Sequence, residues 1–431
     1  MLNGMRTLKS SPPNFAAFLA VMFLACTSQA VWADTLERVV LVSRHGVRPP
    51  TRGNEELNKY SEQAWPEWPV APGELTPHGA TALERMGDGL KQRYGTLLGN
   101  CNFFIWSDGA DSRTRDSGAA LARGLSPGCA ARTAHGAPGK DDPIFDAIDA
   151  GLCPVDPARA QETIEQRLGT ILSRDNAAYV RGRQRLQSIL IPGKTCGSGE
   201  TNACHIASGE NQVRLTKKEA RLDGPLNLGS SLSENLLLEY AQGMQGDQLA
   251  WGRLGKTEAE RKQALAEVLA LHNLYSDVVR RNPYLASRRS TPMMHTILDA
   301  LDGKTSTFKG AAPLPSDNRV LVFLGHDGNL ASLSGLLDSA WSLPGQPDAT
   351  APDTVLAFER WRTGDGKSRV TVRVYYQTLD QLQQLTRFDA HHPVPSLALK
   401  VPGCDGQSCT PEKFRAHLMP KLSGDCITPG P

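Results

Sequence analysis

The sequence has no apolar run long enough to cross a bilayer. The run from Phe15 to Cys26 falls well short of the roughly 20 residues that a membrane-spanning helix needs, and no later segment reaches that length either. A basic start without acidic residues precedes the run, and small residues follow it near Ala30 and Ala33. This pattern predicts an export signal over residues 1–33 and a soluble mature protein.

The end of the same run allows one alternative. Leu24-Ala25-Cys26 resembles the cleavage box of a bacterial lipoprotein, although Phe23 fits the first position of such a box poorly. A lipid anchor at Cys26 would hold the mature protein at a membrane surface. We prefer plain export and keep the lipid anchor as the minor alternative.

The sequence also lacks an excess of charge of either sign. It holds 47 basic and 45 acidic residues, a formal net charge of +2, so no global field attracts nucleic acid or a membrane surface. We therefore expect neither of these as a partner, and any anion site must be local.

The 431 residues exceed what one compact core usually supports, which predicts two domains or one domain with a large insertion. We expect a monomer.

The cysteines do not form the C-x-x-C pairs of zinc ribbons or redox motifs. Of the nine cysteines, Cys26 lies in the expected export signal, and the other eight predict four disulfides in an oxidising compartment. Cys196 with Cys204 and Cys404 with Cys409 are close enough in sequence to form local loops. The adjacent pair His391-His392 does not form a metal-binding pattern either. We expect no metal and no cofactor.

Three short apolar runs share one design. They cover residues 39–42, 103–106 and 320–324. Each indicates a buried parallel strand, and each is followed by polar residues. These polar clusters are Arg44-His45-Gly46, residues 108–115 and Gly325-His326-Asp327. Because open α/β sheets place their sites just beyond the carboxyl ends of strands, we expect the three clusters to converge.

The rest of the chain is interpreted as helical stretches and one hairpin. Residues 76–98 and 256–281 are the clearest helices. Residues 156–290 carry little strand signal, which predicts a mainly α-helical domain inserted into an α/β domain formed by 34–155 and 291–431. Near the C-terminus, apolar and polar residues alternate over 370–375, which predicts a hairpin strand at the edge of the sheet.

The segment R-H-G-V-R-P-P-T, from Arg44 to Thr51, points to phosphate chemistry. A phosphate monoester dianion repels nucleophiles, so its attack requires cationic donors around the phosphoryl oxygens and a neutral nucleophile between them. Arg44 and Arg48 can supply the cations, because a guanidinium fork matches phosphate oxygens and stays charged at any useful pH. His45 can supply the nucleophile, since nearby arginines disfavour its imidazolium form.

The cluster Gly325-His326-Asp327 can supply the remaining steps. His326 can donate to a phosphoryl oxygen, and Asp327 can protonate the departing alkoxide, which is a poor leaving group without that proton. Such a proton donor favours activity at low pH. The alternative is a turn in which Asp327 caps a helix.

The remaining polar residues carry weaker signals. In the segment from Asp111 to Arg115, Arg113 is the better candidate for a third phosphate ligand, while Arg115 could equally pair with Asp111 or Asp116. His272 lies within a predicted helix, and we interpret it as a packing or capping histidine.

Together these motifs resemble those of the histidine acid phosphatase family. The pairing of R-H-G-x-R-x-P with a distant H-D, in an exported chain with eight further cysteines, is most similar to bacterial periplasmic phytases of the AppA type. Supporting segments are 64–69, 241–244, 343–347 and 358–361. The resemblance covers essentially the whole mature chain.

The resemblance implies a fold, a reaction and a disulfide pattern. The implied fold is a phosphoglycerate-mutase-like α/β sheet domain with an inserted mainly α-helical domain, and the site lies between the two. The implied reaction is hydrolysis of phosphate monoesters, phytate (myo-inositol hexakisphosphate) above all, through a covalent phosphohistidine in the periplasm. The implied disulfides are Cys101 with Cys129, Cys153 with Cys426, Cys196 with Cys204, and Cys404 with Cys409.

The resemblance also implies roles for individual residues. His45 is the expected nucleophile and Asp327 the expected proton donor. The expected phosphate ligands are Arg44, Arg48, Arg113 and His326. Thr51, Arg52 and Glu234 match positions that line the substrate pocket of the phytases.

The sequence departs from these relatives in three places. It reads H-D-G-N, with Gly328, where the phytases usually read H-D-T-N. Its loop before Arg113 is one residue longer, which leaves open whether Asp108 matches the pocket aspartate of the family. The basic pocket residue expected near 286–291 is either Arg288 or Arg289.

Several other functions compete with a phytase. A periplasmic sugar phosphatase of the glucose-1-phosphatase kind, or a broad-specificity acid phosphatase, is the nearest alternative, although V-R-P-P-T after R-H-G favours the phytases. Phosphoryl transfer within one substrate, as in the related mutases, is opposed by export and by the cysteines. A protein that only binds anions would need neither a nucleophile nor an acid.

Overall fold

The computed structural model describes residues 33–129, 132–193, 204, 206, 209–216 and 219–428. The expected export signal, apart from Ala33, and the alternative anchor at Cys26 lie outside these residues. In the described part of the chain, none of the helices combines the length and the apolarity that a bilayer crossing requires.

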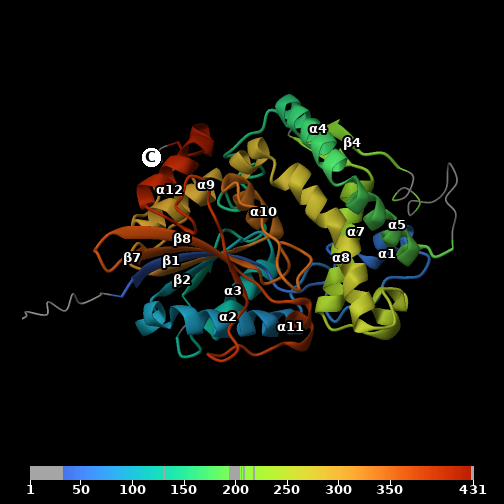
Figure 1. The fold of residues 1–431 in the computed structure, drawn as a ribbon, viewed down its shortest axis with the longest axis horizontal. Helices are drawn as coiled ribbons and strands as arrows, with labels where there is room; N and C mark the ends of the chain where they lie inside the picture. The colour runs from blue at the N-terminus through green and yellow to red at the C-terminus, as the bar shows by residue number, and fades with distance from the viewer. Residues whose placement is uncertain are drawn as a thin grey trace, which may run out of the picture.

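Eight strands of the described chain form one mixed sheet (Figure 1). They are β1 (Thr35–Arg44), β2 (Phe103–Ser107), β3 (Thr133–His135), β6 (Val320–Gly325), β7 (Val355–Arg362), β8 (Ser368–Tyr375), β9 (Ser396–Ala398) and β10 (Ser408–Cys409). Their order is β10-β8-β7-β1-β6-β2-β3, and β9 also pairs with β8. β1 and β2 both pair with β6 in parallel, which confirms the three predicted strands.

The central strands are apolar throughout because both faces of the sheet are covered. Along β1, Val40 and Val42 belong to one core, while Val39 and Leu41 belong to another. Consecutive side chains of a strand point to opposite faces, so a strand buried on both sides needs an unbroken apolar run. This burial explains why the strands could be predicted from composition alone.

Helices cover the sheet on both faces (Figure 1). One face is covered by α2 (Pro77–Leu98) and α3 (Ser112–Leu125), and the other by α9 (Pro283–Leu301), α10 (Asp327–Leu336) and α12 (Pro411–Leu418). The Thr76 side chain accepts a hydrogen bond from Gly79 N and caps α2, so the predicted helix over 76–98 is confirmed.

A group of helices beside the sheet has a core of its own. Its elements are α4 (Pro157–Arg174), α5 (Asn176–Leu190), α7 (Pro225–Ala241) and α8 (Glu258–Tyr275), which lie on the right in Figure 1. A π-helical turn, Ser276–Arg280, continues α8, so the predicted helix over 256–281 is confirmed but changes its winding near the end. The domain boundaries at 155/156 and 290/291 stay a prediction.

Small elements complete the fold. A two-stranded hairpin that the sequence did not indicate, β4 (Gln212–Leu215) with β5 (Ala220–Asp223), lies within the helical region. The short helices α1 (Asn54–Leu57) and α11 (Leu379–Gln384) lie in loops. The prediction that the strand over 370–375 forms the sheet edge is wrong, because β9 and β10 pair with β8.

Three of the four expected disulfides are present. They join Cys101 to Cys129, Cys153 to Cys426 and Cys404 to Cys409. The fourth expected pair includes Cys196, which lies outside the described residues. The pairing that the family resemblance implies is therefore confirmed wherever both cysteines are described.

Candidate active site

The three polar clusters meet at the carboxyl ends of parallel strands. Arg44 ends β1 and pairs in register with Gly325, which ends β6. His45 follows directly, and its backbone N donates to Gly325 O at 2.9 Å. At the end of β2, Asp108 N donates to Leu324 O at 3.0 Å. The predicted convergence is confirmed by this register.

His45 is held in one tautomer inside the protein. Its side chain is buried, with 1% of the residue exposed, and its Nδ1 lies 2.9 Å from Gly46 O. A carbonyl oxygen can only accept a hydrogen bond, so Nδ1 carries the proton and Nε2 keeps its lone pair. Burial, together with the charges of Arg48, Arg44 and Arg113, holds the pKa of His45 well below its usual value.

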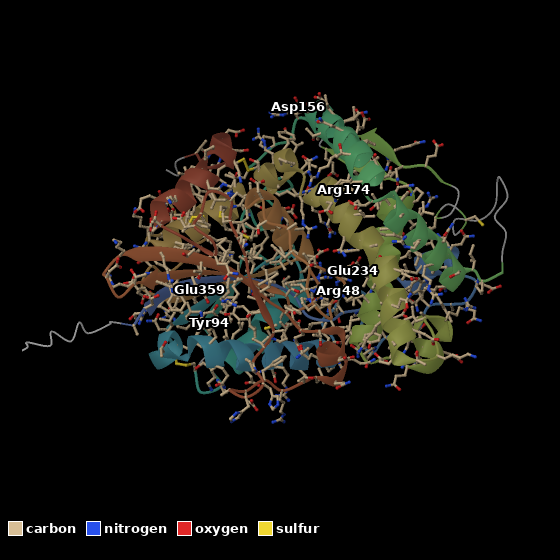
Figure 2. All side chains as sticks on the ribbon, viewed as in Figure 1. Arg48, Tyr94, Asp156, Arg174, Glu234 and Glu359 are labelled. Carbon is tan, nitrogen blue, oxygen red and sulfur yellow. A yellow bond between two sulfur atoms is a disulfide. The ribbon has the colours of Figure 1, made fainter. Side chains whose placement is uncertain are left out.

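Arg44 and Arg48 are tied to a carboxylate on the helical side. Arg44 is fully buried, and it donates to the Glu234 carboxylate and, over 2.5 Å, to Thr350 O. Arg48 Nη2 lies 3.7 Å from the same Glu234 oxygen. Figure 2 shows Arg48 and Glu234 close together beside α7, the helix that supplies Glu234. Pairing of this kind is what allows charges to be buried.

Arg113 joins the group from the first turn of α3. Its Nη2 lies 2.6 Å from Asp111 Oδ2. A Cβ placed on Gly73 would lie 3.7 Å from Arg113 Nη1 and 3.5 Å from Thr51 Cγ2, so these two side chains flank Gly73. Arg115 instead donates to Gly109 O at 2.6 Å. The pairing with Asp111 that the sequence offered for Arg115 is thus made by Arg113, and the role of Arg113 as a phosphate ligand stays a prediction.

Arg52 lies further out than the other expected site residues. Its side chain is 40% exposed, and its Nη1 lies 3.4 Å from Glu56 Oε1 within one helical turn. The contacts of the described residues do not join it to the group around His45.

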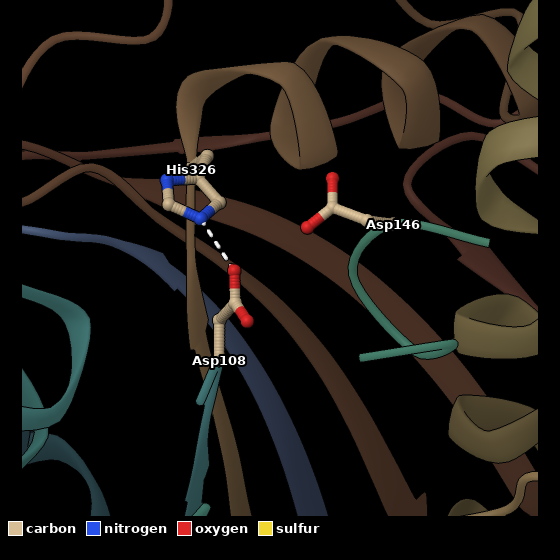
Figure 3. A group of neighbouring side chains, drawn as sticks. All are labelled: Asp108, Asp146 and His326. Carbon is tan, nitrogen blue, oxygen red and sulfur yellow. Dashed lines mark hydrogen bonds and ion pairs between the residues drawn. The ribbon is translucent and has the colours of Figure 1, made fainter. Parts of the chain in front are cut away.

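His326 caps α10 and lies against two carboxyl groups (Figure 3). Its Nε2 lies 2.7 Å from Asp108 Oδ2, and its ring centre is 5.6 Å from that of His45. The carboxylate of Asp108 can only accept a hydrogen bond, so Nε2 carries a proton, and Nδ1 can donate to a ligand only when the ring is positively charged. Burial opposes ionisation of Asp108, but the hydrogen bond to His326 lowers its pKa.

Asp146 completes the group in Figure 3. Its carboxyl could join Asp108 and His326 in holding a cation, because one ligand atom from each lies within 4.8 Å of the others. Burial raises the pKa of Asp146 to about 7, so below that pH a cation would have to displace a proton from this carboxyl. We assign no metal to this group.

Asp327 is the first residue of α10, and it does not stand free. Its Oδ1 accepts from Gly328 N at 2.8 Å. Its Oδ2 lies 2.5 Å from Arg280 Nη1 and 3.6 Å from His272 Nε2. Burial alone would raise the pKa of Asp327, but Arg280, Arg44 and His272 hold it well below its usual value.

Reasoning from the sequence missed two neighbours of the proposed acid. Arg280 lies at the end of a predicted helix, and its position in the sequence does not indicate a role in the site. His272 does pack internally, with Nδ1 3.2 Å from Ser230 Oγ, yet its Nε2 faces Asp327. Of the two candidate basic residues, Arg288 pairs with Asp425, whereas Arg289 lines the same chamber as Asp327.

The fold and the cluster around His45 define a phosphatase, and residues 35–187 match the histidine phosphatase superfamily (branch 2). The chain belongs to this family, because it is also 33% identical to phytase AppA of Escherichia coli (strain K12) over 410 residues, 90% of this chain and 92% of that protein. A structure of Hafnia alvei phytase in complex with myo-inositol hexakis sulphate is 33% identical, with a TM-score of 0.82 over 92% of this chain and 99% of the other. Glucose-1-phosphatase of Providencia rettgeri is 25% identical over 404 residues, 90% of this chain and 92% of that protein.

Proposed function

We propose that the protein is an exported, periplasmic acid phosphatase that hydrolyses phytate through a phosphohistidine intermediate without a metal. The observation that carries this proposal is the state of His45. Its Nδ1 proton is engaged by Gly46 O, its pKa is lowered by burial and by surrounding arginines, and its Nε2 is free to attack. A neutral imidazole among guanidinium groups is what a phosphate dianion requires of its nucleophile.

In the first step, the lone pair of His45 Nε2 attacks phosphorus. The bond from phosphorus to the ester oxygen breaks, and Asp327 gives that oxygen its proton, so the alcohol leaves neutral. Arg44, Arg48, Arg113 and His326 bind the phosphoryl oxygens during this transfer. The phosphoryl group then resides on His45, and Asp327 is a carboxylate.

In the second step, water attacks the phosphohistidine. The carboxylate of Asp327 takes a proton from this water, and the bond between phosphorus and Nε2 breaks. Inorganic phosphate leaves, His45 is again neutral, and Asp327 again carries a proton. The two steps return every group to its starting state.

The proposed substrate is phytate because two relatives that are 33% identical over at least 90% of this chain are named phytases. Thr51, which flanks Gly73 together with Arg113, and the more exposed Arg52 are proposed to contact those parts of a large polyanion that extend out of the pocket. Glu234 is proposed to line this pocket while it orients Arg44 and Arg48, since its carboxylate contacts both.

A rapid-quench experiment tests the proposal. With radiolabelled phytate, the wild-type enzyme should accumulate covalently bound phosphate that is labile in acid and stable in base, as expected of a phosphoramidate. His45→Ala should form none and should not turn over, whereas His391→Ala, in an exposed loop, should behave as the wild type. Turnover by His45→Ala would contradict the covalent mechanism.

A sugar phosphatase is the second candidate, because glucose-1-phosphatases also align along 90% of the chain. The ratio of kcat/KM for phytate to that for glucose 1-phosphate separates the two. We expect the ratio to exceed one. A ratio well below one would assign the protein to the sugar phosphatases and leave the phosphohistidine chemistry intact.

A further inference from the structure

The proposed proton donor, Asp327, is paired with an arginine that has no role in the proposed mechanism. Arg280 Nη1 lies 2.5 Å from Asp327 Oδ2, and it also lies 3.4 Å from His272 Nε2. The two paired side chains are 21% and 16% exposed. The pair is thus sheltered, yet a ligand entering the site can reach it.

The position of Arg280 depends on the π-helical turn Ser276–Arg280 that follows α8. Such turns are rare and occur frequently at functional sites. The turn sends two successive arginines to different partners: Arg280 meets Asp327, whereas Arg281 lies 2.8 Å from Asp277 and 3.2 Å from Ser334 Oγ. Arg280 is therefore presented to the site by local backbone geometry.

The pair borders a chamber of about 190 Å³. Among the residues that line it are Asp146, Tyr275, Arg280, Arg289, His326 and Asp327. At about 30 Å³ per water, the chamber has room for roughly six waters or for a phosphate group with part of its hydration. It is open beside Asp327, because a Cβ on Gly328 would meet nothing within 4 Å.

The two arginines of the chamber differ in their surroundings. Arg289 lies near Asp149 and Glu219, which offset its charge at longer range. For Arg280 the nearest carboxylate among the described residues is that of Asp327. Moving Arg280 away therefore removes the neighbour that lowers the pKa of Asp327 the most.

The pairing with Arg280 opposes the role of Asp327. A general acid must carry its proton when the leaving group departs, whereas a guanidinium in contact stabilises the carboxylate. The charged and titratable groups that face Asp327 are Arg44, His45, Arg48, Glu234, His272 and Arg280. Among these, Arg280 is the group in direct contact.

We propose that, when substrate binds, Arg280 leaves Asp327 and pairs instead with a neighbouring phosphate of the substrate that is not being cleaved. This exchange of partners allows Asp327 to hold the proton that it gives to the leaving group. The inference rests on the proposed function and adds a substrate class, namely esters that carry a second phosphate beside the one being cleaved. The arginine stays paired with an anion throughout, so no unpaired charge is left in the site.

The exchange predicts that one substitution affects two substrates differently. In Arg280→Gln, phytate loses a charge-assisted hydrogen bond, and its KM should rise about tenfold or more. For β-glycerophosphate, which has one phosphate and a similarly poor leaving group, KM should stay unchanged. Its kcat/KM should persist to higher pH, because Asp327 keeps its proton more readily without the neighbouring guanidinium.

Matched variants isolate the charge of Arg280. Arg281→Gln removes the adjacent arginine and its bond to Asp277, but it should move neither the phytate KM nor the pH profile. Arg280→Lys keeps the charge and should keep the pH profile of the wild type. Thermal unfolding of each variant measures any loss of stability separately.

A binding measurement tests the exchange in enzyme that retains Arg280. When myo-inositol hexakis sulphate binds at pH 5, the wild type should take up more protons than Asp327→Asn, as measured by calorimetry in buffers of different ionisation enthalpy. Equal uptake by both proteins would overturn the inference. Equal loss of activity toward both substrates in Arg280→Gln, or no change toward either, would overturn it as well. If the wild type forms no phosphohistidine, it is the proposed function that fails instead.

Discussion

The buried carboxyl group of Glu239 should make the stability of this enzyme depend on pH. The residue lies on α7 and is fully buried. Its Oε2 accepts from Ala250 N at 2.9 Å, while its Oε1 has no hydrogen-bond partner within the described residues. Burial in this setting raises the pKa of Glu239 from 4.5 to about 8. Between these two values the folded protein binds a proton that the unfolded chain does not.

The sign and size of the effect follow from proton linkage. Because the pKa of Glu239 is higher in the folded state, its stabilising contribution is complete below pH 4.5 and is lost as the pH rises toward 8. One unit of pKa difference corresponds to about 1.4 kcal/mol. The free energy of unfolding should therefore fall by a few kcal/mol, on the order of 5 at most, across this range.

Glu239→Gln keeps an acceptor for Ala250 N and removes the titration. We expect urea unfolding at pH 4 to give nearly equal stabilities for variant and wild type. At pH 8 the variant should be more stable by a few kcal/mol. Asp146, whose pKa burial raises to about 7, contributes with the same sign to both proteins and cancels in the comparison.

The control for this experiment is Glu55→Gln, an exposed carboxylate on α1. It should leave the pH dependence of unfolding unchanged. Parallel pH curves for Glu239→Gln and the wild type would refute the reasoning, because they would mean that Glu239 is ionised inside the folded protein.

Other features of the site and the fold give further predictions. Asp327→Asn should slow alkyl phosphates far more than p-nitrophenyl phosphate, because only the alkoxide needs a proton to leave; equal losses of kcat would remove Asp327 from the acid role. Replacing Cys153 and Cys426 together by serine should lower the free energy of unfolding by about 2–5 kcal/mol, as measured by urea titration. EDTA should leave the rate of phosphate release unchanged. If EDTA lowered this rate and added metal restored it, a metal site at Asp108, Asp146 and His326 would be indicated.

The strands and the central motif could be predicted because each is local in sequence. A strand buried on both faces is an unbroken apolar run, and its parallel pairing places the residues that follow it at one edge. His45 and its flanking arginines are contiguous, so their chemistry is visible before any fold is known. The β4–β5 hairpin was missed because its strands, Gln212–Leu215 and Ala220–Asp223, are short and largely polar.

Contacts between distant segments could not be predicted in this way. Arg280 lies in a π-helical turn at the end of one helix, and it meets Asp327 at the start of another helix 47 positions later in the chain. Arg288 and Arg289 are neighbours in sequence, but successive residues of a helix point about 100° apart, so only the structure could distinguish them. Glu234 was predicted through family resemblance, and its contact with both arginines followed from the fold.

The bridge between Cys153 and Cys426 encloses most of the chain in a covalent ring, since the two residues are 273 positions apart. The helices that supply Glu234, His272 and Arg280 all lie inside this ring. A protease that cuts once in a loop of the enclosed segment leaves both pieces joined, so the severed ends stay at high effective concentration and the cut can be tolerated. This ring therefore turns a single cleavage from a dissociation of the protein into a local defect.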